Sequence, residues 1–371
     1  MASAEFAAGP GLSPEARDRL RLIRTTGIGP VTFRQLLARF GTAAAAIDAL
    51  PALARRGGGR PPVVVDDRQI AREIERVAAL GARYLLLGDG AYPPLLAETE
   101  DAPPALIVAG DPALAARPVV AMVGARNASA AAVRFARALA HDLSGRGQVV
   151  ASGLARGIDT AAHVGSLDGG TIAVIAGGID IVYPPENDRL QHAIAERGLL
   201  IAEQPPGIEP RARHFPSRNR IIAGLAWGTV VVEAAPRSGS LITARLAAEA
   251  GREVMAVPGS PLDPRAQGCN LLIREGATLV QSADDVVELA SPLLARVASP
   301  PAMFRDAGGL PDVTEGDRRR LVDLLGPVPV AVDEVVRLSG LPPAIVQTVL
   351  LELELGGRLD RHAGGRVSLS G

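Results

Sequence analysis

Arginine, glycine and serine occur together at three places in the middle of the sequence. They form Gly124-Ala125-Arg126-Asn127, the stretch Ser-Gly-Leu-Ala-Arg-Gly-Ile-Asp at 152–159, and Arg-Ser-Gly-Ser-Leu-Ile-Thr at 237–243. Glycine lets backbone amides approach a phosphate group, and arginine can bind the same group with two parallel hydrogen bonds. One such loop is often only turn chemistry. Three of them, each after an apolar run, predict a site for phosphate groups.

A cluster of cations lies at 211–220, where four arginines and one aromatic residue stand within ten positions without an acidic residue. Arginines bind backbone phosphates, and Phe215 can stack on an unpaired base. We also expect Ser217 to cap a helix that begins at Arg218. The alternative interpretation is a solvated loop that is anchored by a buried Phe215.

Composition excludes several classes of enzyme. The 371 residues carry 39 basic and 40 acidic side chains, for a net charge of −1, and every basic residue is arginine. Without lysine there is no P-loop ATPase, protein kinase or Schiff-base enzyme. Cys269 is the single cysteine, the five histidines lack metal-ligand spacing, and neither G-x-G-x-x-G nor G-x-S-x-G occurs. We therefore expect no catalytic residue, no metal and no cofactor.

Asp159 and His163 lie four residues apart on an expected helix. Such a pair is more often a helix cap and a surface histidine than an acid/base dyad, so we expect Asp159 to cap the helix. The N-terminus shows no signal-peptide pattern, and no apolar run is long enough to span a bilayer. We expect a soluble cytoplasmic protein without a membrane partner.

Alternating strands and helices must position the three loops. Continuous apolar strands are expected at 119–123, 149–151, 171–176, 199–202, 229–232 and 253–257. Uninterrupted apolar strands with helices between them predict a doubly wound, mostly parallel α/β sheet of Rossmann type, covered on both faces. In such folds ligands bind beyond the carboxyl ends of the strands, near the switch in strand order. The three loops lie at these ends.

Helical segments flank this zone, and we divide the chain into four parts. These are a helical domain at 1–80, the sheet domain at 81–294, a linker at 295–314, and a domain at 315–371 with three helices and a small hairpin.

In the first domain, Thr-Gly-Ile-Gly-Pro at 26–30 is typical of a helix-hairpin-helix turn that contacts DNA, or equally of a plain turn between helices. The last domain has the pattern of a winged helix, whose recognition helix is expected at 343–355. That helix has no arginine, and residues 315–371 carry eight acids and seven arginines. This composition favours association with a protein partner, or self-association, over binding of duplex DNA.

The central motifs resemble the DNA-processing protein A family (DprA/Smf). The motifs that carry the resemblance are Gly124-Ala125-Arg126, the stretch at 152–159, Phe215-Pro216-Ser217-Arg218-Asn219-Arg220-Ile221-Ile222, Ser238-Gly239-Ser240-Leu241-Ile242-Thr243-Ala244, Ala256-Val257-Pro258-Gly259 and Gly268-Cys269-Asn270 with Leu272-Ile273. The flanking domains match a full-length layout with a SAM-like helical domain and a winged helix. The resemblance implies an extended Rossmann domain that binds single-stranded DNA, forms a homodimer, and loads RecA onto incoming strands in natural transformation.

The expected DNA-binding residues follow from the resemblance and from the arginine-rich loops. They are Gly124, Arg126, Ser152, Gly153, Arg156, Arg213, Phe215, Arg218, Asn219, Arg220, Ser238, Gly239 and Ser240. Ala125 stands where the family usually has serine, which removes one hydroxyl donor to phosphate. Arg211 and Arg213 take the place of the lysines that the family often has near the Phe-Pro motif.

Two other functions are compatible with parts of the sequence. One is a nucleotide phosphoribohydrolase of a related Rossmann group, although its P-G-G-x-G-T-x-x-E signature is absent and Glu233 is the nearest candidate glutamate. The other is a duplex-binding regulator that acts through the winged helix. The leading prediction is a binding protein for single-stranded DNA that is not an enzyme.

Overall fold

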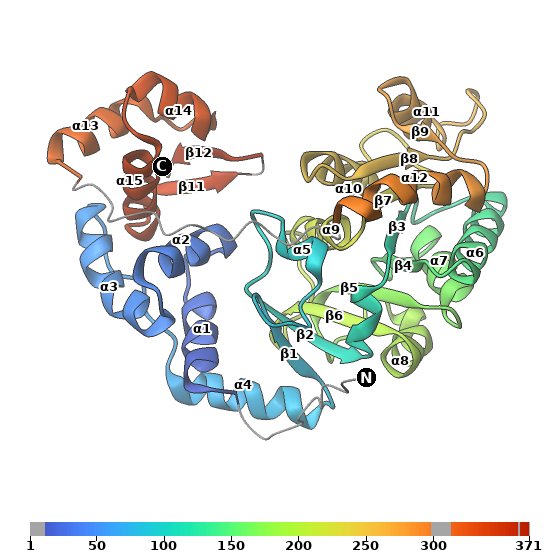
Figure 1. Cartoon of the computed structure of the whole chain (residues 1–371), viewed down its shortest axis with the longest axis horizontal. Helices are drawn as coiled ribbons and strands as arrows, with labels where there is room; N and C mark the ends of the chain where they lie inside the picture. The colour runs from blue at the N-terminus through green and yellow to red at the C-terminus, as the bar shows by residue number, and fades with distance from the viewer. Residues whose placement is uncertain (1–11, 298–312, 363, 371) are drawn as a thin grey trace. The chain divides into compact units, whose positions relative to one another are not determined.

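The computed structural model describes residues 12–297, 313–362 and 364–370, which fall into two compact units (Figure 1). One unit contains the described residues up to Ile74 together with those from 313 onward, and the other begins at Glu75. Most of the expected linker at 295–314 lies outside the described residues.

A nine-stranded sheet forms the centre of the second unit. Its strands are β1 (Arg83–Leu86), β2 (Ala105–Gly110), β3 (Val119–Val123), β4 (Val149–Ser152), β5 (Thr171–Gly178), β6 (Leu199–Gln204), β7 (Gly228–Val231), β8 (Glu253–Ala256) and β9 (Thr278–Leu279). They lie in the order β1-β2-β6-β5-β4-β3-β7-β8-β9. The pairs among β3 to β9 are parallel, and β2 is antiparallel to both β1 and β6. The order reverses between β3 and β7, which is the switch point of a Rossmann-type sheet.

Helices cover both faces of this sheet. The cores on one face contain residues of α6 (Ala130–Gly145), α7 (Ile158–Ser166), α8 (Asp188–Arg197) and α12 (Ala283–Val297), and the core on the other contains residues of α9 (His214–Leu225), α10 (Gly239–Glu249) and α11 (Gln267–Arg274). Short helical segments are α5 (Pro94–Ala97), η1 (Pro112–Ala116) and η2 (Pro185–Asn187). Along β3, Val119, Ala121 and Val123 belong to one core and Val120 and Met122 to the other, because successive side chains of a strand point to opposite faces.

The first unit combines the two ends of the chain. Its N-terminal part contains α1 (Pro14–Arg24), α2 (Pro30–Phe40), α3 (Ala43–Arg56) and the start of α4 (Asp67–Ala79), which continues into the second unit. Its C-terminal part contains α13 (Glu315–Leu324), β10 (Val330–Ala331), α14 (Val332–Ser339), α15 (Pro343–Leu355), β11 (Leu359–His362) and β12 (Arg366–Leu369). Three helices with a three-stranded antiparallel sheet form a winged helix. The expected fold class, with a Rossmann-like sheet between a helical domain and a winged helix, is confirmed.

Two predictions about helix ends are wrong. Ser217 does not cap α9, which begins three residues earlier at His214, and its hydroxyl donates to the carbonyl of Arg213 at 3.2 Å. Pro216 is tolerated there because the first turn of a helix needs no backbone N–H donor. Asp159 is not the cap of α7 but its second residue, and it accepts the N–H of Ala155 at 3.3 Å.

Within the described part of the chain, no single helix is long and apolar enough to cross a membrane. Two pairs of helices, 30–40 with 43–56 and 332–339 with 343–355, reach that length and composition only when taken together, and each pair is sharply bent.

Candidate nucleic-acid interface

Two adjoining pockets lie at the carboxyl ends of the central strands, beside the switch between β3 and β7. The larger pocket has a volume of about 600 Å³ and the smaller one about 200 Å³. Both are lined by Arg126, Ala155, Phe215 and Arg218. The loops after β3 and β4 and the start of α9 therefore form the boundary between them.

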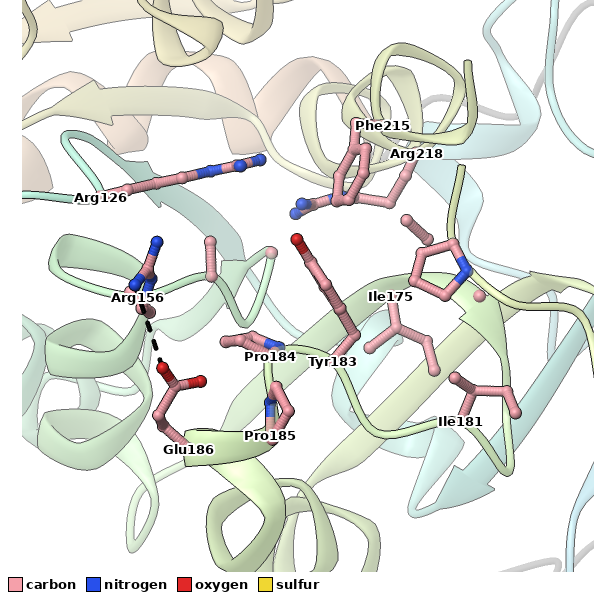
Figure 2. A pocket seen from close by; sticks show the side chains of 15 residues that line it. Arg126, Arg156, Ile175, Ile181, Tyr183, Pro184, Pro185, Glu186, Phe215 and Arg218 are labelled. Carbon is pink, nitrogen blue, oxygen red and sulfur yellow. Dashed lines mark ion pairs between the residues drawn. The ribbon is translucent and has the colours of Figure 1, made fainter. Parts of the chain in front are cut away.

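The smaller pocket combines apolar walls with cations (Figure 2). Ile175 and Ile181 lie on one side, and Tyr183 extends from the loop after β5 toward the centre. Arg126 and Arg218 extend toward each other from opposite sides. These walls offer apolar surface for a flat ring and positive charge for an anion.

Arg156 closes the smaller pocket at another side. Its guanidinium lies 3.9 Å from the carboxylate of Glu186, and both side chains are more than half exposed. An exposed pair of this kind is weak and yields readily to a competing anion.

The larger pocket is richer in hydrogen-bond donors. Its lining includes Gly124, Ala125 and Asn127 from the loop after β3, Asn219 from α9, and the loop 235–240 that leads into α10. Ser238 caps α10 by accepting the N–H of Ser240 at 3.4 Å, and the two hydroxyls lie 2.7 Å apart. The N-terminus of α10 adds partial positive charge beside Arg237, so this pocket is suited to phosphate groups.

Gly153 is required by Arg218 rather than by a ligand. A Cβ atom at Gly153 would lie 1.2 Å from Nη1 of Arg218, so only glycine leaves room for the guanidinium. Arg218 is almost completely buried, and its Nε has no hydrogen-bond partner within the described structure. Burial lowers the pKa of Arg218 to about 10, which leaves it protonated at neutral pH.

The charge of Arg218 interacts with a buried aspartate, Asp159. Asp159 is 6 % exposed, and burial raises its pKa, opposed chiefly by the charge of Arg218 and by the N–H of Ala155. No ion pair joins Asp159 and Arg218 in the described part of the chain, so the compensation acts at longer range. Arg218 therefore keeps positive charge available to the pockets.

His163 lies beneath the same site and is not a surface residue. Its Nδ1 lies 2.7 Å from the hydroxyl of Thr171, which donates to the carbonyl of Val150 and must therefore accept from the imidazole. Burial, reinforced by the charge of Arg218, lowers the pKa of His163 to about 3. The neutral imidazole supports the site without adding charge.

Phe215 is held between a cation and a second aromatic ring. The guanidinium carbon of Arg126 lies 5.1 Å from the centre of its ring, and the ring of Tyr183 lies 5.7 Å away at 56°. Aromatic pairs and cation–π contacts of this kind stabilise the ring in one orientation. Phe215 thus stands, partly exposed, where both pockets meet.

Backbone strain marks two loops of the site. Leu154 (φ 54°) and Arg237 (φ 65°) are the two non-glycine residues with positive φ in the described chain. Such conformations are uncommon for side chains of this size and persist where the surrounding structure fixes them. Both follow the strands that end at the pockets, β4 and β7.

The structure brings together ten of the thirteen predicted DNA-binding residues. Those that line a pocket are Gly124, Arg126, Gly153, Arg156, Phe215, Arg218, Asn219, Ser238, Gly239 and Ser240. Ser152 is fully buried and donates to the carbonyl of Met122 at 2.6 Å. Arg213 is exposed outside both pockets, and Arg220 is ion-paired with Glu203.

The site also contains charged and aromatic residues that were not predicted. Tyr183 and Glu186 line the smaller pocket, and Arg237 and Arg265 line the larger one. Arg237 stands within a stretch already noted for its composition, and Tyr183 follows a predicted strand. No local pattern in the sequence points to Arg265 or Glu186.

Glu233, the candidate glutamate for ribosyl chemistry, stabilises the fold. It is 7 % exposed, accepts the N–H of Ser129 at 2.8 Å, and lies 3.6 Å from Arg265. It therefore holds the N-terminus of α6, and its oxygens already have partners.

Comparisons with known proteins agree with this architecture. The family model described as "DNA recombination-mediator protein A" matches residues 83–291. A model for a DprA-like N-terminal HHH domain matches residues 13–76, and one for a DprA winged helix domain matches residues 305–365.

The chain is also similar to individual proteins of known sequence or structure. The DNA processing protein DprA of Streptococcus pneumoniae is 44% identical over 225 residues, which are 60% of this chain and 78% of the relative. The crystal structure of DprA from that species aligns with a TM-score of 0.64 and 38% identity, covering 73% of this chain and 97% of the other. DNA processing protein A from Helicobacter pylori, whose structure is described for its single-stranded DNA binding mode, aligns with a TM-score of 0.51 and 28% identity over 58% of this chain and 97% of the other. The chain belongs to the DNA recombination-mediator protein A family, the DprA/Smf family.

Proposed function

We propose that the two pockets bind single-stranded DNA, with backbone phosphates in the larger pocket and one base in the smaller. The observation that carries this proposal is the meeting of two arginines that form no ion pair with a partly exposed aromatic ring. Among the described residues, neither Arg126 nor Arg218 forms an ion pair, and Phe215 lies between the pockets. The Helicobacter pylori relative, described for its single-stranded DNA binding mode, supports the same function for this chain.

The larger pocket supplies the donors that phosphate groups need. The hydroxyls of Ser238 and Ser240, the amides at the start of α10, and the side chains of Arg126 and Arg237 all face it. A charged donor to a phosphate oxygen makes a short and strong hydrogen bond. Because these donors read only the backbone, they position the strand without selecting its sequence.

The smaller pocket fits an unpaired base better than a paired one. Its volume of about 200 Å³ and its walls of Ile175, Ile181 and Tyr183 suit one flat ring beside Phe215. In duplex DNA the bases are stacked and paired, so placing one here costs a few kcal/mol of unstacking. Preference for single strands therefore follows from the smaller pocket.

A salt-series anisotropy titration tests this assignment. The ligands are a single-stranded oligonucleotide, the matching duplex and a mononucleotide, compared for the native protein, Arg126→Ala and the control Arg137→Ala, an exposed arginine on α6. We expect Arg126→Ala to weaken single-strand binding and to reduce the slope of log affinity against log salt by about 0.7 for each phosphate that is no longer neutralised. Equal affinity and slope for Arg126→Ala and Arg137→Ala would refute the pocket. Release of free base from the mononucleotide would instead favour a ribosyl hydrolase.

Membership of the family supports further parts of the proposal. A recombination mediator delivers its strand to a recombinase, so we include RecA as the partner, homodimerisation of this chain, and a role in natural transformation in the cytoplasm. The test is filament assembly by RecA on single strands that are coated with single-strand-binding protein. We expect the native chain to accelerate filament assembly and Arg126→Ala to give no acceleration. Sedimentation velocity measures whether the chain forms a dimer.

A further inference from the structure

The recognition helix of the winged helix is covered on two sides within the first unit. Val346, Val349 and Leu350 of α15 belong to the core of the winged helix itself. Leu351 and Leu355 belong to a different core, which they share with helices of the N-terminal domain. At about 100° per residue, these two sets occupy opposite faces of one helix.

Polar side chains of α15 continue the same contact. The carboxylate of Glu354 accepts from the hydroxyl of Thr32 on α2 at 2.7 Å and from Nε of Arg361 on β11 at 2.7 Å. The amide of Gln35 donates to the side chain of Gln347 at 2.8 Å. Two polar side chains of α15, Gln347 and Glu354, are thus bonded to the chain's own N-terminal domain.

A buried charge completes the contact near the end of α15. Glu352 is 1 % exposed and accepts from Arg318 of α13 at 2.8 Å and 3.3 Å, with Arg56 of α3 at 3.8 Å. A charge so deeply buried is tolerated only with such partners.

Two glycines allow the backbones to meet. A Cβ atom at Gly57 would lie 1.8 Å from the carbonyl oxygen of Glu352, and one at Gly59 would lie 1.8 Å from that of Gly356. Any side chain at these positions therefore separates the two domains. The glycine run after α3 is a contact surface and not only a loop.

We propose that α15 is the docking helix for the N-terminal domain of the same chain and does not read duplex DNA. The winged helix then acts as an internal partner that holds the N-terminal domain. This accounts for a recognition helix without arginine, because its second face meets leucine, threonine and glutamine side chains rather than phosphates. The proposal stands independently of the function assigned to the two pockets.

Chemical crosslinking of the full chain tests the proposal. Gln35→Cys and Gln347→Cys are combined and treated with a short bis-maleimide, while the native Cys269 is fully buried. We expect an internal crosslink within monomeric chains that neither Gln35→Cys alone nor Gln347→Cys alone gives. Adding duplex DNA should leave its yield unchanged. A crosslink only between two chains, no crosslink, or suppression by duplex would each overturn the proposal.

Two glycine variants test whether the crosslink depends on the close approach of the backbones at Gly57 and Glu352. Gly57→Ala should abolish the internal crosslink, and Gly326→Ala should preserve it, because nothing lies within 4 Å of a Cβ at Gly326. A crosslink that survives Gly57→Ala would refute the contact. Should that variant fail to fold, the crosslink and duplex experiments in the native background still decide the question.

Discussion

Replacing Gly153 by alanine tests whether Arg218 must lie where the structure places it. The added methyl group would lie 1.2 Å from Nη1 of Arg218, whereas ordinary contacts begin near 3.4 Å. The guanidinium must therefore move by about 2 Å, because Gly153 directly follows β4, which is paired with β3 and β5 on its two sides. Such a displacement removes Arg218 from the boundary of the two pockets.

The size of the effect follows from the hydrogen bond that Arg218 can then no longer donate to the DNA. A hydrogen bond from a charged donor contributes about 1.5–3 kcal/mol. Since about 1.4 kcal/mol corresponds to a factor of ten, single-strand affinity should fall about 10- to 100-fold. The salt slope should fall by about 0.7 if one phosphate is no longer neutralised. Overpacking should cost about 1–3 kcal/mol of folding stability, which circular dichroism and thermal unfolding will report separately.

Anisotropy titrations of four proteins separate this mechanism from general damage. They are Gly153→Ala, Arg218→Ala, the double variant, and the control Gly145→Ala, which has open space around its Cβ. If alanine at position 153 acts through Arg218, the double variant should bind like Arg218→Ala alone, because neighbouring effects are not additive. Native affinity for Gly153→Ala, or full additivity in the double variant, would refute the reasoning.

Three further outcomes are expected. Phe215→Leu should weaken single-strand binding about tenfold because leucine cannot stack on a base, with an unchanged salt slope; an altered slope at native affinity would contradict the stacking role. Glu352→Gln removes the buried carboxylate that accepts from the half-buried Arg318 and should lower the free energy of unfolding by about 1.5–3 kcal/mol in urea titrations, while single-strand affinity stays unchanged. His163 binds protons less readily in the folded chain (pKa about 3, against 6.5 unfolded), so its contribution to stability is full above pH 6.5 and is lost as pH falls toward 3. The native chain should lose about 2 kcal/mol from this group between pH 7 and pH 5, and His163→Gln should not; equal pH slopes would disprove it.

The sheet and most helices could be predicted because their signals are local. Strands such as Thr171–Gly178 are continuous apolar runs that end at glycine, and α15 has the predicted bounds, 343–355. The start of α9 could not be predicted from Pro216, because proline marks a helix start chiefly at the first helical position and Pro216 is the third residue of α9. The sequence therefore predicts that a helix exists in this segment, but not the residue at which it begins.

The site was predicted only as far as neighbours along the chain determine it. Arg218 and Arg220 are two residues apart on α9, so they point to different sides of the helix. One lies under Gly153 and the other is ion-paired with Glu203. A count of arginines in 211–220 cannot separate them, because Glu203 comes from β6 and only the folded sheet brings it near. For the same reason, the burial of His163 could not be predicted from its neighbours in the sequence.

Pairing, rather than the number of arginines, decides where this chain can bind a polyanion. The winged helix and the sheet domain both carry arginines, and the whole chain has a net charge of −1. In the winged helix Arg318 and Arg361 are bonded to Glu352 and Glu354, so their charge is already neutralised within the fold. In the pockets Arg126 has no such ion pair among the described residues, and Arg218 is balanced only at longer range by Asp159. A phosphate group is therefore attracted more strongly at the switch point of the sheet than at α15. This difference separates a DNA site from an internal contact in a chain with almost no net charge.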